Sequence, residues 1–119
     1  MRKAKPLDRL MDVFEILRSI DPTMHLSLAH AFVAVALRPG LSMDELGELV
    51  NLSQSSCSRN IMTLGKGTPS TREGHRLVRT DYDPEDGRRM IILPTTKGRA
   101  LARELASVLE LPEQSKPGQ

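Results

Sequence analysis

The stretch from Ser42 to Leu64, SMDELGELVNLSQSSCSRNIMTL, decides the fold. Ser42 is a favourable N-cap, and Glu45 stands three residues later, which is the spacing of a capping box. Apolar residues then recur at helical spacing, at Met43, Leu46, Leu49 and Val50. The period breaks at Asn51, and Ser53 can cap a further helix that runs to Leu64. The stretch therefore predicts two short helices around a tight turn.

The second of these helices carries the functional signal. With 3.6 residues per turn, Cys57, Ile61 and Leu64 share one narrow stripe, which predicts a buried face. The opposite face holds short polar side chains, one cation and no carboxylate: Ser55, Ser56, Arg59, Met62 and Thr63. Hydroxyls and an Arg suit the major groove, where they reach phosphates and base edges, whereas a merely solvated face more often mixes Glu and Lys. We interpret the pair as a helix-turn-helix whose second helix recognises DNA.

Composition limits the class of protein. A chain of 119 residues with 39% hydrophobic content suits one domain with a modest core. The sequence shows no membrane-spanning run and no signal-peptide core, and its one cysteine cannot form an internal disulfide, so we expect a cytoplasmic protein. Aromatic residues make up 3%, which argues against a stacking platform for single-stranded nucleic acid.

Charge is informative through its distribution. The formal net charge of +2 alone does not indicate a nucleic-acid partner. Basic residues, however, collect in the second half of the chain, at Arg72, Arg76, Arg79, Arg88 and Arg89. The first helix of the motif is acidic by contrast.

Three further helices are predicted around the motif. Residues 6–20 are apolar over more than half of the helix circumference, at Leu7, Leu10, Met11, Val13, Phe14, Ile16, Leu17 and Ile20. Such a helix requires burial on more than one side, either in the core or at a subunit interface. Residues 26–37 are nearly all apolar, which places them at the centre of the core. Thr95 or Thr96 can cap a last helix with a buried side formed by Ala100, Leu101, Leu105, Val108 and Leu109.

A hairpin is predicted between the motif and the last helix. Residues 77–80 and 88–93 have strand composition, and the segment between them, DYDPEDG, is dense in turn formers. Pro94 is expected to end the second strand. Before the hairpin, Gly65 to Gly67 supply glycine for a left-handed helix cap, and residues 68–75 look like an exposed loop.

The order helix, helix, helix-turn-helix, hairpin, helix is that of a winged helix, in which the hairpin is the wing. We therefore expect a single, mainly α domain with one small β-hairpin. Its parts are an N-terminal helix and possible dimerisation element in residues 1–25, the winged helix-turn-helix in 26–94, a C-terminal helix in 95–111 and a disordered tail in 112–119.

Four short motifs in this order resemble the MarR-type winged-helix regulators. They are the leucine-serine-x-x-glutamate-leucine opening at 41–46, the leucine-serine-glutamine-serine turn at 52–55, the Asp-Pro-x-Asp-x-Arg wing tip at 83–88, and Thr-x-x-Gly at 95–98. The resemblance covers residues 26–109. It implies that DNA contacts in the major groove come from Gln54, Ser55, Ser56 and Arg59. It also implies that Arg88 reaches the minor groove, with Asp86 holding it in place.

The sequence also departs from the family pattern. Asn60 stands where the family usually has an apolar residue, and residues 68–75 form a longer loop than usual. Family members usually add a long C-terminal helix that forms the dimer with the N-terminal one, and we expect an atypical member without it. Thr63, on the outer face of the second motif helix, and Arg89, at the wing tip, complete the candidate DNA-binding residues.

The leading hypothesis is a sequence-specific regulator that binds double-stranded DNA, as a homodimer. The wing arginines could instead form a solubilising tip, paired with Asp83, Glu85 and Asp86. Two other functions stay open: a winged-helix protein–protein adaptor, and an accessory factor of replication or a mobile element that binds DNA without specificity. No catalytic, metal-ligand or cofactor motif is visible, so we expect a non-enzyme without cofactor or metal. A small-molecule effector is compatible with the resemblance, but no residue supports one.

Overall fold

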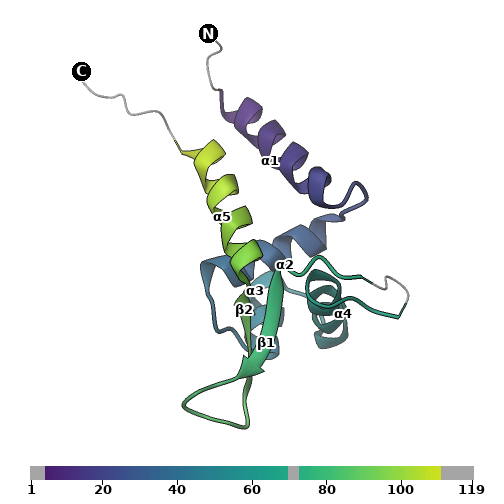
Figure 1. The fold of residues 1–119 in the computed structure, drawn as a ribbon, viewed down its shortest axis with the longest axis vertical. Helices are drawn as coiled ribbons and strands as arrows, with labels where there is room; N and C mark the ends of the chain where they lie inside the picture. Colours follow the sequence, from purple (N-terminus) through teal and green to yellow (C-terminus); the bar gives the residue numbers. More distant parts are fainter. Residues whose placement is uncertain (1–4, 70–72, 111–119) are drawn as a thin grey trace, which may run out of the picture.

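The computed structural model describes residues 5–69 and 73–110, which form helices and one antiparallel hairpin (Figure 1). The helices are α1 Pro6–Ile20, α2 Leu26–Leu37, α3 Met43–Val50, α4 Gln54–Leu64 and α5 Thr96–Leu109. Strand β1, Val78–Tyr82, pairs with β2, Met90–Pro94, in a register that sets Val78 opposite Pro94. The predicted order and fold class, a mainly α winged helix with a small hairpin, are confirmed.

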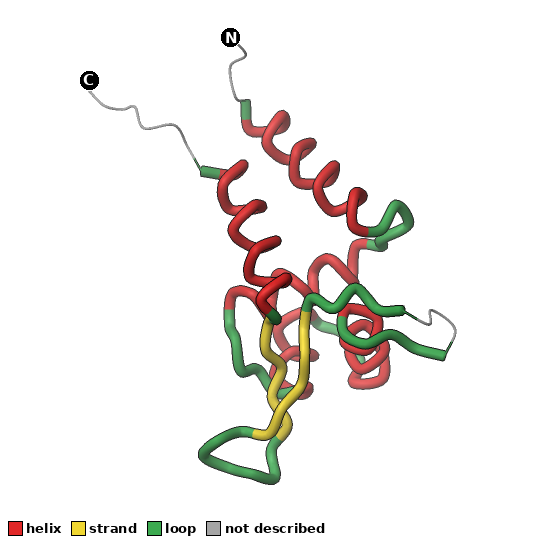
Figure 2. Tube along the Cα trace, viewed as in Figure 1, coloured by secondary structure: helices red, strands yellow, loops and turns green. Residues whose placement is uncertain are grey.

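Helix α2 lies at the centre of the core, as its apolar composition predicts. Leu28, Phe32 and Val35 are fully buried, and α3, α4, α5 and β2 all pack against this helix. Figure 2 shows the hairpin and the other helices arranged around it. The buried helix α2 therefore supports α3 and α4, the two helices of the helix-turn-helix, which both pack against it.

The caps of α3 and α4 follow the predicted positions. The Ser42 Oγ accepts a hydrogen bond from the Glu45 N–H at 3.1 Å, and the Glu45 carboxylate accepts one from the Ser42 N–H at 2.9 Å. Asn51 ends α3 in the left-handed conformation, with φ of 59°. The Ser53 Oγ then accepts a hydrogen bond from the Ser56 N–H at 3.2 Å and begins α4. The predicted helix-turn-helix is therefore confirmed.

The strands of the hairpin are shifted from the predicted ranges by one or two residues. Leu77 lies before β1 because its N–H donates to the Leu64 carbonyl at 2.7 Å, and its own carbonyl accepts from the Thr95 N–H at 3.0 Å. Arg88 and Arg89 belong to the wing turn, where the Arg89 N–H donates to the Asp86 carbonyl at 2.9 Å. Pro94 is the last residue of β2, as expected.

The segment after α4 agrees with the prediction in its helix cap and differs from it in the loop. Gly65 ends α4 with φ of −99°, and Gly67, with φ of 109°, adopts the left-handed conformation predicted for residues 65–67 and donates its N–H to the Met62 carbonyl. The end of the predicted exposed loop is packed, because the His75 N–H donates to the Thr63 carbonyl at 2.9 Å. Residues 70–72, with Arg72 of the predicted basic group, lie outside the described residues.

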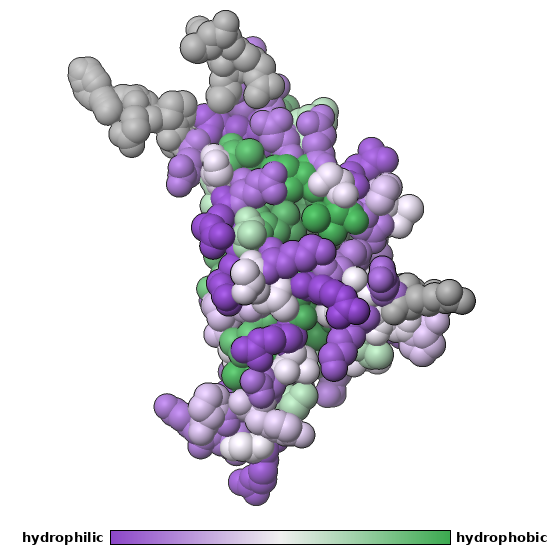
Figure 3. All heavy atoms as spheres, viewed as in Figure 1, coloured by the Kyte–Doolittle hydropathy of each residue, from purple (hydrophilic) through white to green (hydrophobic). Residues whose placement is uncertain are grey.

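Helices α1 and α5 pack against each other. Leu17 of α1 is buried, and the buried guanidinium of Arg9 donates a hydrogen bond to the carbonyl oxygen of Glu110. In the single chain, part of the apolar face of α1 stays exposed, at Leu7, Leu10, Met11 and Phe14. Figure 3 shows hydrophobic residues gathered over the upper half of the molecule, where α1 and α5 run.

The buried side of α5 is partly different from the predicted one. Leu101 and Leu105 are buried as expected, but Ala100 and Leu109 are exposed. Gly98 takes a buried position instead, because the first turn of α5 packs directly against the backbone of Leu77. The predicted tail, at 112–119, lies outside the described residues.

Candidate nucleic-acid interface

The outer face of α4 presents most of the predicted recognition residues to solvent. The side chains of Gln54, Ser55 and Arg59 are exposed, whereas those of Ser56 and Thr63 are half-buried. The opposite face packs on α2 and α3 through Cys57, Asn60, Ile61 and Leu64. The stripe predicted to be buried is therefore buried, and the polar outer face remains available for a ligand.

The burial of Asn60 was not predicted. Its side-chain amide is near the Ser27 carbonyl and hydroxyl on α2, at 3.5 and 3.4 Å, so these hydrogen bonds are long. Asn60 lies three residues after Cys57 on the same side of the helix, so the helical spacing could have identified it as buried. The Asn60 side chain therefore contacts α2 and does not belong to the outer face of α4.

The start of α4 carries a group of three neighbouring hydroxyls. The Ser53 Oγ lies 3.3 Å from the Ser55 Oγ and 3.1 Å from the Ser56 Oγ. Hydroxyls at a helix N-terminus suit contact with a phosphate of DNA. Ser53 was predicted only as a cap, and its position in this group follows from that same role.

Helix α4 and the hairpin face each other across two surface cavities. One, of about 390 Å³, is lined by Gln54 and Ser58 of α4, by the hairpin at Thr80 and Met90, and by the start of α3, including Asp44. The other, of about 310 Å³, lies between the end of α4 and β1. Ser58 was missed by the sequence reasoning, although it lies one helical turn after Gln54 and its spacing could have revealed it. Residues of α4 and of the hairpin thus line the same two cavities.

The wing tip exposes Arg88 almost completely. Its side chain is 96% exposed, and its Nε lies 3.8 Å from the Asp86 Oδ1. The same carboxylate accepts a hydrogen bond from the Arg88 N–H at 3.2 Å. Asp86 therefore lies beside Arg88, and the arginine side chain stays exposed at the end of the hairpin with only this loose ion pair.

Arg89 has a different environment, although it follows directly in the sequence. Its guanidinium donates to the Glu45 Oε1 at 2.7 Å and to the Asp83 Oδ2 at 3.1 Å. The pKa of Glu45 is lowered, first by the Ser42 N–H and then by the charge of Arg89. The pKa of Asp83 is lowered, first by the Glu85 N–H and then by Arg89. The arginine thus joins the wing to the start of α3 through two ionised carboxylates.

The loop before the hairpin is tied to the end of α1. The His75 Nε2 lies 3.0 Å from the Asp21 Oδ2, and the Lys97 ammonium donates to the His75 carbonyl at 3.0 Å. The pKa of Asp21 is lowered, chiefly by the hydrogen bond from the Thr23 N–H. These contacts hold the segment after α4 against α1 and α5, and sequence reasoning missed them because Asp21 and His75 are far apart in the chain.

Other features of the described residues do not suggest chemistry. Cys57 is buried, and desolvation raises the pKa of its thiol, so it behaves as a small hydrophobic side chain. Within residues 5–69 and 73–110, no group of three His, Cys, Asp or Glu side chains could hold a metal ion. None of the helices described here is long and apolar enough to cross a membrane.

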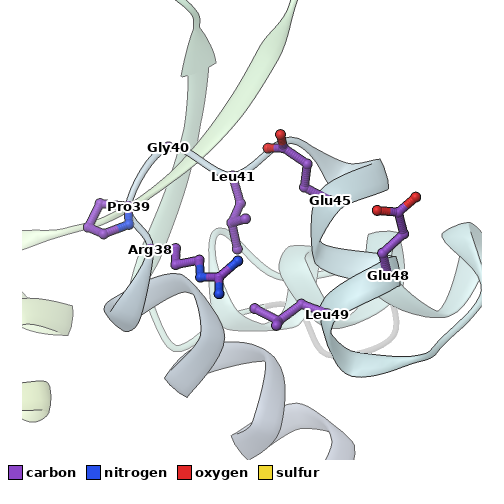
Figure 4. Close-up of a pocket in the computed structure, with 7 residues that line it drawn as sticks. All are labelled: Arg38, Pro39, Gly40, Leu41, Glu45, Glu48 and Leu49. Atoms are coloured by element: carbon purple, nitrogen blue, oxygen red, sulfur yellow. The ribbon is translucent and has the colours of Figure 1, made fainter.

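A surface cavity of about 580 Å³ lies between the end of α2 and α3 (Figure 4). Arg38 lines it from the end of α2, and Glu45 and Glu48 line it from α3. Glu45 is the carboxylate that also binds Arg89, so this cavity adjoins the attachment of the wing.

The sequence matches no protein-family model and no curated protein. The fold, however, is similar to solved structures. The MepR–DNA complex of S. aureus superposes with a TM-score of 0.67 at 17% identity, covering 86% of this chain and 76% of that chain. RV1404 of Mycobacterium tuberculosis superposes with a TM-score of 0.67 at 15% identity, and the match covers 85% of this chain and 64% of RV1404. The PcaV transcriptional regulator of Streptomyces coelicolor superposes with a TM-score of 0.59 at 22% identity, and the match covers 85% of this chain and 69% of PcaV. This chain therefore has the winged-helix fold of the MarR-type regulators.

Proposed function

We propose that this chain is a sequence-specific transcriptional regulator that binds double-stranded DNA as a homodimer. The observation that carries the proposal is the outer face of α4, which exposes Gln54, Ser55 and Arg59 and contains no carboxylate. The solved DNA complex of MepR supports it, because that protein binds DNA with the same fold. In the proposed complex α4 lies in the major groove and the wing in the adjacent minor groove.

The polar side chains on the outer face of α4 have chemical counterparts in the major groove. The Arg59 guanidinium can donate two hydrogen bonds to the O6 and N7 of guanine, and the Gln54 amide can pair with adenine. The hydroxyls of Ser55, Ser56 and Thr63 suit phosphates or base edges. We assign base recognition to Gln54 and Arg59, because they are the longest polar side chains of this face.

The charges of the hairpin favour Arg88 as the contact in the minor groove. Asp81 is paired with Arg79 at 2.9 Å, and Asp83 is paired with Arg89 at 3.1 Å. These carboxylates are therefore compensated within the hairpin, and Arg88 extends beyond them with its side chain 96% exposed. The narrow minor groove concentrates negative potential and attracts such an arginine.

The exposed apolar residues of α1 support a dimer. Leu7, Leu10, Met11 and Phe14 form an apolar face at the end of the molecule opposite to the wing. A two-fold dimer through this end would place the two α4 helices on half-sites about one helical turn of DNA apart. The same face also fits a different protein partner, so a winged-helix adaptor is the second candidate function.

The test is selection from a random pool of duplex DNA across a salt series, with sequencing of the bound fraction. Enrichment of a palindromic motif with steep salt dependence is the expected result. Salt-sensitive binding without a motif would favour a non-specific accessory factor. Absence of binding even at low salt would refute the DNA-binding proposal and favour the adaptor.

Three variants assign the contacts. Arg59→Ala should weaken binding by about 1–3 kcal/mol and relax the preference for one base step in each half-site. Arg88→Ala should weaken binding evenly across sequences. It should also lower the salt slope, which is the slope of the logarithm of the binding constant against the logarithm of the salt concentration, by about one per half-site. Arg103→Ala is the matched control, because Arg103 is exposed on α5, away from α4 and the wing. If all three variants bind alike, the residue assignments are wrong.

A further inference from the structure

We propose that Arg89 is a positioning residue, which fastens the wing to the start of α3 through Glu45 and Asp83 so that Arg88 is held for the minor groove. This inference rests on the proposed function and deepens it. It assigns opposite tasks to two adjacent arginines: Arg88 contacts DNA, and Arg89 fixes the hairpin that carries it.

The side-chain geometry separates the two arginines. The Arg89 guanidinium makes two ion pairs, at 2.7 and 3.1 Å, and its side chain is 38% exposed. The Arg88 side chain is 96% exposed, and its nearest carboxylate, Asp86, lies at 3.8 Å. Two charge-assisted hydrogen bonds hold a guanidinium far more firmly than one loose contact. Arg89 is therefore engaged within the protein, whereas Arg88 is only loosely paired and almost fully exposed.

The backbone of Arg89 strengthens this attachment. Its carbonyl accepts a hydrogen bond from the Asp83 N–H at 2.7 Å, and its N–H donates to the Asp86 carbonyl at 2.9 Å. Arg89 thus closes the wing turn through its main chain and ties the turn to α3 through its side chain. Movement of Arg89 would move the whole turn, including Arg88.

Glu45 gives the attachment a fixed point on α3. Its Oε1 accepts both the Ser42 N–H of the capping box and the Arg89 guanidinium. Nearby, the Ile92 N–H donates to the Leu41 carbonyl at 2.8 Å, which binds β2 to the segment before α3. The contact between Arg89 and Glu45 extends this attachment three residues further toward the wing tip.

A direct contact of Arg89 with DNA would lose these interactions. Moving the guanidinium to a phosphate would break two ion pairs and leave the carboxylates of Glu45 and Asp83 uncompensated near the DNA backbone. Their repulsion would oppose the new contact. A rigid wing, by contrast, lowers the entropic cost of placing Arg88 in the groove.

The decisive variant is Glu45→Gln, compared with Glu48→Gln on the same helix (Figure 4). Glutamine keeps the capping box and loses the charge that holds Arg89. If Arg89 positions the wing, Glu45→Gln weakens binding to the selected duplex about three- to tenfold, and Glu48→Gln does not. If Arg89 is a phosphate contact, Glu45→Gln releases it and removes a repelling charge, so binding tightens. That result overturns the proposal.

A double-mutant cycle gives a second readout, which general destabilisation would not change. In the Arg89→Ala background the penalty of Arg88→Ala should shrink, because a loose wing no longer places Arg88. The double variant, Arg89→Ala with Arg88→Ala, should have the same salt slope as Arg89→Ala alone. Additive penalties, each with its own loss of about one from the salt slope per half-site, would show that Arg89 contacts phosphate and would overturn the proposal.

Amide hydrogen exchange tests the attachment without DNA. The Asp83 and Arg89 amides should exchange faster in Glu45→Gln than in the unaltered chain or in Glu48→Gln, because the wing turn opens more often. Unchanged exchange would refute the positioning role. If the unaltered chain binds no duplex, the proposed function fails, and the exchange experiment still decides whether Arg89 holds the wing.

Discussion

Replacing Gly98 by alanine would test how closely α5 approaches the hairpin. A Cβ on Gly98 would lie 2.0 Å from the carbonyl oxygen of Leu77 and 3.1 Å from its carbonyl carbon. That oxygen is held in place, because it accepts the Thr95 N–H at 3.0 Å and because Leu77 is fully buried. The contact is with backbone, so rotation of a side chain cannot relieve it, and either α5 or β1 must move.

The expected loss of stability follows from two opposing terms. Overpacking of a buried site costs about 1–3 kcal/mol, and a backbone contact this short belongs at the upper end of that range. Alanine in place of glycine gains up to about 1 kcal/mol of helix propensity. We therefore expect Gly98→Ala to lower the free energy of unfolding by about 2 kcal/mol, taking both terms together. For a domain of this size, that loss lowers the melting temperature by about 10 °C.

The assay is thermal and urea unfolding followed by circular dichroism. Gly87→Ala is the control, because a Cβ on Gly87 meets nothing within 4 Å. The control should unfold within about 0.5 kcal/mol of the unaltered chain. If Gly98→Ala is as stable as the control, α5 does not approach the backbone of Leu77 as described.

Four other substitutions test the fold in the same unfolding assay. Phe32→Ala should cost about 3–5 kcal/mol, because Phe32 is fully buried at the centre of α2. Ser53→Ala should cost about 1 kcal/mol through loss of the cap of α4. Asn60→Leu should cost less than about 1 kcal/mol, because the hydrogen bonds that it removes are long; a loss above about 2 kcal/mol would contradict this. The lowered pKa of Asp21 means that its charge stabilises the fold at neutral pH and that this contribution disappears as the pH falls through the folded-state pKa. The stability difference between the unaltered chain and Asp21→Asn, measured by urea unfolding from pH 7 to pH 3, should therefore narrow below about pH 4.

The helix-turn-helix was predictable because its signals are local. The capping box joins Ser42 to a residue three positions later, and Ser53 caps the turn that follows it directly. The buried stripe of α4 repeats with the period of the helix, so a short window of sequence contains it. Interactions within one or two helical turns produce a pattern that is visible in the sequence. Once the buried stripe of α4 is known, the polar residues on the other side of the helix form its outer face.

Contacts between distant segments left no comparable signal. Arg89 and Glu45 are 44 positions apart, and His75 and Asp21 are 54 positions apart. The limits of the strands were wrong for the same reason, because Leu77 is bound by Leu64 and Thr95 rather than by the hairpin. Residue type and spacing predict which side chains are polar, but the tertiary fold determines which of them pair with each other.

The two wing arginines show where this limit affects function. In the sequence Arg88 and Arg89 are adjacent, have the same charge and follow the same acidic turn, so both were candidates for DNA contact. Adjacent residues in a turn point in different directions, and only the direction of Arg89 leads to Glu45. The arginine that satisfies the protein's own carboxylates rigidifies the wing, and the one without a close partner remains available to a phosphate or a base. Within this wing, the capacity of an arginine to bind DNA therefore depends on which carboxylates the turn places beside it.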